Sequence, residues 1–106
     1  MANEQKYNGW TNYETWNVKL WLDNDGTVEN IFKDQAQTFY NEALEDNRRN
    51  RAIYILADSI KDFVEDENPL IDQANMFADM LNAALRNVNW FEIAESIFDD
   101  YVETEE

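Results

Sequence analysis

Apolar side chains recur along the chain at spacings of three and four residues, and little interrupts that period, since only 2 glycines and 1 proline occur among 106 residues. This spacing is typical of amphipathic helices, whereas the residues of a half-buried strand alternate with a period of two. The sequence therefore predicts an all-α protein that folds as a compact single-domain bundle of about five helices.

The length and the composition indicate one folded domain. A chain of 106 residues can bury a core without a disulfide or a structural metal. Hydrophobic residues make up 44% of it and aromatic residues 14%, which excludes a disordered acidic tail. We assign residues 1–106 to a single helical domain with flexible ends at 1–8 and 104–106. No stretch resembles a signal peptide or a membrane span, so we expect a cytoplasmic protein without a membrane partner.

Polar residues predict the ends of the first helix. Thr11 and Glu14 have the spacing of a capping box, so this helix should begin near Asn12. Gly26 is suited to the left-handed turn that follows a helix C-terminus. The helix between these points is apolar around much of its circumference, which is typical of a central helix. The sequence leaves open whether Trp10 packs on the first turn or is exposed.

The remaining helices follow from the same signals, with polar breaks between them and asparagine at two of their starts. The second is predicted from about Val28 to Asp46, a third after the "NRRN" break at 47–50, a fourth from Asn68-Pro69, and a fifth from Asn89 with Glu92. Their apolar stripes predict one shared core, which contains Trp16, Leu20, Phe39, Leu56, Phe77, Leu81 and Ile97.

The charge is strongly negative and unevenly distributed. The formal net charge is −15, and residues 62–106 carry −12 of it, because they hold 13 acidic residues and only one basic residue, Arg86. Such a surface repels nucleic acid and attracts basic protein surfaces. By helical periodicity, nine of these and neighbouring acids fall on outward faces of the third and fifth helices. We predict a partner-binding surface at Asp58, Asp62, Glu65, Asp66, Glu92, Glu95, Asp99, Asp100 and Glu103.

The stretch "GWTNYETW" at residues 9–16, continued by Leu20-Trp21-Leu22 and Asn24, resembles the N-terminal signature of a family of small uncharacterised proteins of phages, plasmids and other mobile elements. The similarity covers roughly residues 8–26. It implies a mobile-element origin, but it implies no biochemical activity and no site residues.

Few catalytic groups are available, because the chain contains no histidine and no cysteine. Metal-assisted phosphate chemistry is the one enzyme class that fits, as in all-helical Mg-dependent nucleotide pyrophosphatases. Three acid pairs have the i, i+3 spacing that a metal site would use, although a composition this acidic produces such pairs by chance. We therefore expect no enzyme, no catalytic residue, no cofactor and no metal. The three pairs are Glu42 with Glu45, Asp62 with Glu65, and Glu92 with Glu95.

Arg48, Arg49 and Arg51 form the only basic cluster. It could serve as a small nucleic-acid site, as a counter-patch in self-association, or as a set of cations that balance a helix C-terminus. The first role conflicts with the overall charge, so we expect no direct binding of nucleic acid.

These observations favour an inhibitor that mimics nucleic acid. Carboxylates along a helix recur every 4.5 to 6 Å of rise at ~1.5 Å per residue, which approaches the charge spacing of DNA. In charge and size the chain is similar to acidic DNA-mimic proteins with anti-CRISPR or anti-restriction activity. Its expected partner is a host nucleic-acid-binding protein, a CRISPR or restriction effector. The alternatives are an acidic protein-protein interaction or dimerising accessory module without mimicry, which leaves a homodimer open, and thirdly the pyrophosphatase.

Overall fold

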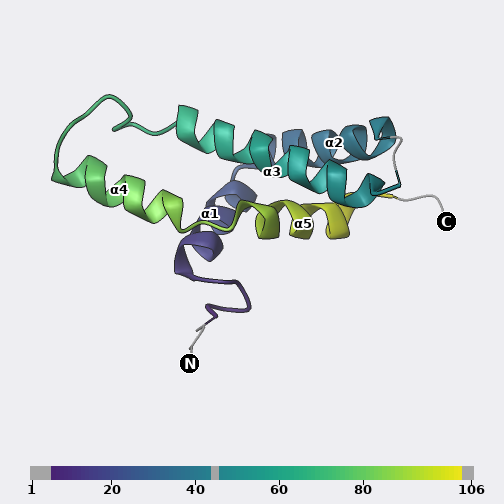
Figure 1. Ribbon diagram of the computed structural model, residues 1–106, viewed down its shortest axis with the longest axis horizontal. Helices are drawn as coiled ribbons and strands as arrows, with labels where there is room; N and C mark the ends of the chain where they lie inside the picture. Colours follow the sequence, from purple (N-terminus) through teal and green to yellow (C-terminus); the bar gives the residue numbers. More distant parts are fainter. Residues whose placement is uncertain (1–5, 44–45, 104–106) are drawn as a thin grey trace.

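A computed structural model describes residues 6–43 and 46–103 of the chain. Five α-helices account for most of them, and the only β-type pairing in this part of the chain is a single bridge between Tyr7 and Trp10. The prediction of one all-α bundle is thereby confirmed (Figure 1). The helices are α1 (Tyr13–Asn24), α2 (Gly26–Glu42), α3 (Arg48–Asp66), α4 (Met76–Arg86) and α5 (Trp90–Tyr101).

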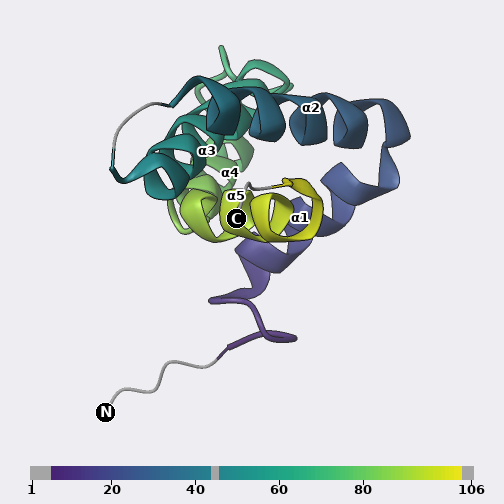
Figure 2. The same cartoon turned by 90° about the vertical axis from the view of Figure 1, so that its right-hand side faces the viewer.

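Helices α2, α3 and α5 pack against one another, and α1 packs on α2 and α5. Helix α3 runs antiparallel to α5, because Arg49 near the start of α3 contacts Asp99 near the end of α5, while Tyr54 contacts Phe91 near its beginning. In Figure 2, α2 lies over α3 and α5, and α1 leads down to the N-terminal turn. Helix α4 lies apart from this group, at one end of the molecule (Figure 1).

The core lies where these packed helices meet. It consists of Leu22, Phe32, Ala36, Tyr40, Ala52, Ile53, Leu56, Ala57, Ile60, Val88, Ile93, Ala94, Ile97 and Phe98. The stripes predicted for the second, third and fifth helices supply nearly all of these side chains. Of the seven core residues predicted from the sequence, Leu56 and Ile97 are buried there, and Phe39 packs against the core from its edge.

The other four predicted core residues lie elsewhere, so that part of the prediction is wrong. Trp16 and Leu81 are only partly buried and lie outside the core cluster, and Leu20 and Phe77 are exposed. Trp16 and Leu20 belong to α1, and Phe77 and Leu81 belong to α4. Because α4 lies apart from the packed helices (Figure 1), its apolar side chains have little to pack against.

Helix α1 turns a side that mixes polar and apolar residues toward the bundle, since Val18 also packs against the core. Its buried residues are Thr15, Lys19 and Leu22, whereas Trp16 packs on Tyr7 and Tyr13 outside the core. Because apolar residues surround α1, hydrophobicity alone selects no face. The buried Thr15 hydroxyl accepts a hydrogen bond from the Asn89 N–H at the start of α5, and this contact fixes the Thr15 side of α1 toward the bundle.

The residues that cap α1 differ from those predicted at both of its ends. Asn12, not Thr11, is the N-cap, and its Oδ1 accepts from the backbone N–H of Thr15 at 2.9 Å. At the other end Asp25 terminates α1 and also caps α2, accepting from the N–H groups of Thr27 and Val28. Gly26 is consequently the first residue of α2 and has no left-handed conformation, so its predicted role was wrong.

Residues 7–10 form a tight turn ahead of α1. The φ angles of Asn8 and Gly9 are 49° and 88°, and Tyr7 and Trp10 exchange two backbone hydrogen bonds of 2.8 Å. Asn-Gly is favoured in such a turn because both central residues need positive φ. Tyr7 and Asn8, which the sequence analysis placed in a flexible end, belong to this turn, while residues 1–5 and 104–106 lie outside the described chain.

The predicted break at 47–50 belongs mostly to a helix. Helix α2 ends at Glu42, earlier than predicted, and α3 begins at Arg48. The Nε of Arg48 donates to the backbone carbonyl of Tyr40 at 2.8 Å, and its guanidinium lies 4.1 Å from the Tyr40 ring centroid. Arg48 therefore acts at the C-terminal end of α2, as one of the hypotheses for the basic cluster proposed.

The predicted start of the fourth helix at Asn68-Pro69 is also wrong. Asn68 instead forms a turn, because its Oδ1 accepts from the N–H of Leu70 at 2.8 Å. Helix α4 begins at Met76 after the N-cap Asn75, whose Oδ1 accepts from Ala78 N–H at 2.9 Å. The start of α5 is as predicted, since the Oδ1 of Asn89 accepts from the Glu92 N–H at 3.0 Å.

Candidate partner-binding surfaces

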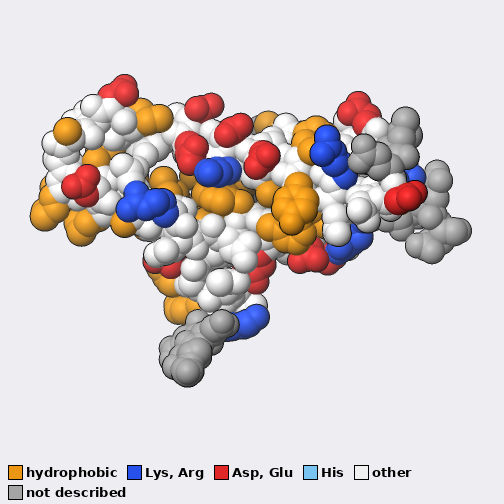
Figure 3. Space-filling view, in the orientation of Figure 1, with side chains coloured by type: hydrophobic (Ala, Val, Ile, Leu, Met, Phe, Trp, Pro, Cys, Tyr) orange, Lys and Arg blue, Asp and Glu red, His pale blue; other side chains and the backbone are white. Residues whose placement is uncertain are grey.

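A row of carboxylates lies along the outer face of α3. Asp58, Asp62 and Asp66 are separated by four residues each, so they lie on one side of the helix about 6 Å apart along its axis. All three are exposed, and within the described residues none of them forms a salt bridge. Figure 3 shows acidic side chains over the part of α3 nearest α4. We call Asp58, Asp62 and Asp66 the α3 acidic row.

The charges of α3 oppose the dipole of that helix. Its first turn contains Arg48, Arg49 and Arg51 and no acid, and its last turn contains acids and no base. A helix N-terminus carries partial positive charge and a C-terminus partial negative charge, so this arrangement is unfavourable at both ends. Residues 58–67 hold five acids and Lys61, a net charge of −4. The acids at the C-terminal end of α3, Asp66 of the acidic row among them, therefore cost stability rather than contributing it.

The acids of α5 have a different environment. Glu95 and Asp99 both contact the Arg49 side chain of α3, at 3.4 and 2.6 Å. The hydrogen bond to Asp99 raises the pKa of the Arg49 guanidinium. Glu92 accepts from the backbone N–H of Thr11 at 3.0 Å. These three acids thus join parts of the fold, and their charges are not all available to a partner.

The nine acids predicted for the partner surface therefore form two groups. The α3 acidic row and the partly buried Glu65 lie toward the C-terminal end of α3. Glu95 and Asp99 lie beside its N-terminal end, where they contact Arg49. Arg49 and Asp66 are about 25 Å apart along α3 at ~1.5 Å per residue, so Glu95 and Asp99 lie toward the opposite end of this helix from the α3 acidic row. The second group also contains Glu92, Asp100 and Glu103. Glu92 is bound to the Thr11 N–H, whereas Asp100 and Glu103 are exposed, and the backbone of Glu103 is hydrogen-bonded to Gln37.

The polar residues of the N-terminal segment hold two helix starts together. Thr15 is 0% exposed, and its hydroxyl donates to Asn12 Oδ1 at 2.6 Å while accepting from the Asn89 N–H at 2.9 Å. Asn12 Nδ2 also donates to the Asn87 carbonyl at 2.7 Å. We call Asn12, Thr15 and Asn89 the polar clamp. Its members stabilise the junction of α1 with α5, so this part of the "GWTNYETW" stretch has a structural role.

Trp10 packs against the core, whereas the other aromatic residues of that segment face outward. Tyr7, Tyr13 and Trp16 pack with ring centroids 4.9 to 5.5 Å apart, and Tyr7 and Tyr13 remain substantially exposed. Trp21 is 65% exposed on the same helix. Exposed aromatic side chains are enriched at the energetic centres of protein interfaces. The sequence analysis assigned this segment mainly to the core. The sequence did contain a signal for this exposed surface, because a helix that is apolar on all sides must expose one of them when it packs at the edge of the bundle.

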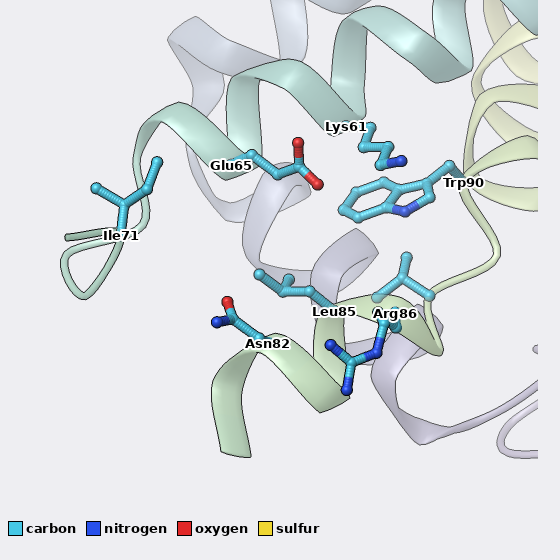
Figure 4. A pocket seen from close by; sticks show the side chains of 8 residues that line it. Lys61, Glu65, Ile71, Asn82, Leu85, Arg86 and Trp90 are labelled. Carbon is cyan, nitrogen blue, oxygen red and sulfur yellow. The ribbon is translucent and has the colours of Figure 1, made fainter. Parts of the chain in front are cut away.

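An open groove of about 600 Å³ separates α3 from α4 (Figure 4). Glu65 and Lys61 line it from α3, Leu85 and Arg86 from α4, and Trp90 lies between the two helices. The lining holds one carboxylate and two cations beside apolar side chains, so it has no paired carboxylates for general acid and base chemistry. Its other lining residues are Ile71, Asn82 and Val88.

The acid pairs considered for a metal belong to separate helices. Asp62 and Glu65 lie on α3, Glu92 and Glu95 lie on α5, and Glu45 is outside the described residues. No group of three or more acids in residues 6–43 and 46–103 is placed to hold a metal ion. In the same part of the chain, no helix has both the length and the apolar character that a bilayer span requires.

Comparison with known proteins gives one match. No curated protein and no solved structure matches the chain. A family model described as a family of unknown function (DUF7249) matches residues 3–101, which includes all five helices and every acid of the two groups except Glu103. The chain therefore belongs to this family of unknown function, DUF7249.

Proposed function

We propose that the chain is a mobile-element-encoded inhibitor that binds the nucleic-acid site of a host defence nuclease, such as a CRISPR or restriction effector. It acts in the cytoplasm of a bacterial or archaeal host, without catalysis, cofactor or metal, and it presents carboxylates where the nuclease would bind phosphates. A net charge of −15 favours a basic protein partner and disfavours direct contact with nucleic acid.

The α3 acidic row is the observation that carries this proposal. Its carboxylates lie about 6 Å apart on a rigid helix, so they can meet several Arg or Lys side chains of a phosphate-binding groove together. The C-terminal end of the row also opposes the α3 dipole, and the row places like charges at i, i+4; both effects destabilise a helix. A feature that costs stability and has no cation partner within the described chain is more readily explained by binding than by folding.

A competition experiment tests the proposal. A short fluorescent DNA duplex is bound to each of several purified CRISPR and restriction effectors at low salt, and the chain is added while the anisotropy is measured. Displacement of the duplex from at least one effector, which weakens as salt is raised, is the expected result. If the chain displaces the duplex from none of them, nucleic-acid mimicry is wrong.

Two matched variants then locate the binding surface. Asp62→Asn with Asp66→Asn removes two charges from the α3 acidic row, and Asp34→Asn with Glu42→Gln removes two exposed acids from α2. Loss of two exposed charge pairs worth about 0.5–1 kcal/mol each should weaken inhibition roughly 5- to 30-fold for the first variant. Equal weakening by both variants would indicate bulk charge and no localised surface.

The second candidate function is an interaction module that does not mimic nucleic acid. The outward aromatic side of α1 favours it, because Tyr13 and Trp21 offer apolar area that a groove for phosphates would not use. A Trp21→Ala variant separates the two functions. If it abolishes partner binding while the Asp62→Asn, Asp66→Asn variant binds normally, the aromatic side of α1 is the binding surface.

A further inference from the structure

Helix α4 has almost nothing covering its apolar side. Ala78 is its only buried residue, although Met76, Phe77 and Met80 are 62%, 61% and 57% exposed. We call Met76, Phe77 and Met80 the α4 apolar face. Figure 3 shows hydrophobic side chains at the end of the molecule where α4 lies. A helix of 11 residues is marginal in water unless its apolar face packs on something.

The groove described above separates α4 from the rest of the bundle, so the bundle itself does not supply that packing. Leu85 faces the groove with Arg86, whereas the α4 apolar face is not part of its lining. Each of the three exposed side chains has an accessible area of roughly 200 Å², so the face exposes roughly 350 Å² of apolar surface. Patches of this size on a monomer often mark an interaction site.

We propose that a second copy of this chain covers the α4 apolar face, so that two α4 helices pack antiparallel across a twofold axis near Met80. An interface of standard size takes about 800 Å² from each partner, somewhat more than half of it apolar. The α4 apolar face supplies most of that apolar share. This inference is independent of the nucleic-acid mimicry proposed above.

The spacing of residues on α4 suits a self-complementary contact. Met76, Met80 and Ala84 follow each other at i, i+4 and lie along one line of the helix. In an antiparallel pair centred on Met80, each Met76 lies opposite the smaller Ala84 of the second copy, and the two Met80 side chains meet. A twofold interface requires that one surface fit itself in this way.

The local charge permits two copies to meet at this face. The whole chain carries −15, but residues 69–91 hold only Asp72, Asp79 and Arg86, a net charge of −1. Asp79 lies in the first turn of α4 and Arg86 in its last turn. With Met80 on the axis, neither residue lies on the Met76, Met80 and Ala84 line that the two copies share, and the antiparallel arrangement aligns the two helix dipoles favourably.

Self-association should strengthen with salt, because the remaining charge of each copy repels the other. Salt at about 0.5 M shortens the screening length to a few ångströms, compared with roughly 14 Å at about 0.05 M. Binding of an acidic row to a basic nuclease has the opposite salt dependence. The failure of one proposal can therefore be distinguished from the failure of the other.

Sedimentation equilibrium of the full chain at low and high salt tests the dimer. The wild type should be a dimer that tightens as salt is raised. Phe77→Glu should weaken self-association at least tenfold, while Trp21→Glu, an equally exposed aromatic on α1, should leave it unchanged. Circular dichroism checks that both variants keep the helical fold. A monomeric wild type in high salt, or a Trp21→Glu variant that abolishes association, overturns the proposal.

A cysteine placed at the proposed axis tests the geometry directly, because the chain has no cysteine of its own. Met80→Cys should form an intermolecular disulfide under mild oxidation with glutathione disulfide, since Cα atoms must come within about 7 Å of each other for that bond. Asn30→Cys, exposed on α2, is the control. If Met80→Cys cross-links no faster than Asn30→Cys, the antiparallel α4 pair is wrong.

Discussion

Removing the buried Thr15 hydroxyl should lower the free energy of unfolding by more than the small change in side-chain volume suggests. Thr15→Val keeps the shape of the side chain but deletes the donor to Asn12 Oδ1 at 2.6 Å and the acceptor of the Asn89 N–H at 2.9 Å. A buried donor without its partner costs about 1–3 kcal/mol, and a lost hydrogen bond about 0.5–1.5 kcal/mol. Together the two costs span about 1.5–4.5 kcal/mol. Because Asn89 is exposed and water can replace the lost partner of its N–H, we expect a loss in the lower part of this sum, about 2 kcal/mol.

Urea unfolding followed by far-UV circular dichroism measures this loss, and it should appear as a lower midpoint with an unchanged slope. The thermal midpoint should fall by roughly 8–16 °C. Thr11→Val is the control, because the Thr11 hydroxyl has only a 3.4 Å contact with Asn89 in an exposed position. It should change stability by less than about 0.5 kcal/mol. A similarly small effect of Thr15→Val would refute the structural role assigned to the polar clamp.

Two further stability predictions follow from the packing. Trp16→Ala should lower the free energy of unfolding in urea by about 1–2 kcal/mol, less than the ~3–5 kcal/mol expected of a core tryptophan. Leu56→Ala, at a side chain that is 0% exposed, should lower it by about 2–5 kcal/mol. Equal losses would show that Trp16 is buried as a core residue. Asp99→Asn should cost less than about 1 kcal/mol, because its contact with Arg49 is half exposed, and the loss should shrink in salt; a loss that salt does not reduce would contradict a surface ion pair.

The sequence predicts the core of three helices well because each has one apolar stripe. Ile53, Leu56 and Ile60 can face only one side of α3, and that side is buried. Helix α1 lacks such a stripe. Its orientation depends on the contact between Thr15 and Asn89, which are 74 residues apart in the chain, and periodicity cannot reveal a contact of that kind.

The candidate site divides in the same way. The α3 acidic row is visible in the sequence because a spacing of four places its members on one side of any helix. The pairing of Arg49 with Asp99 cannot be seen in the sequence, since these residues are 50 positions apart. Nor can the amphipathic pattern of α4 indicate that the bundle leaves Phe77 uncovered, because the pattern specifies which face is apolar and not what lies against it.

If the α3 acidic row exists for binding, neutralising it should make the protein more stable. Asp62→Asn with Asp66→Asn removes negative charge from the C-terminal end of α3 and relieves an i, i+4 repulsion, which together should raise the free energy of unfolding by about 0.5–1 kcal/mol. The gain should shrink as salt is raised. Asp34→Asn, in the middle of α2, should change stability little. A double variant less stable than the wild type would show that these carboxylates support the fold, and their unfavourable placement would then no longer argue for a partner.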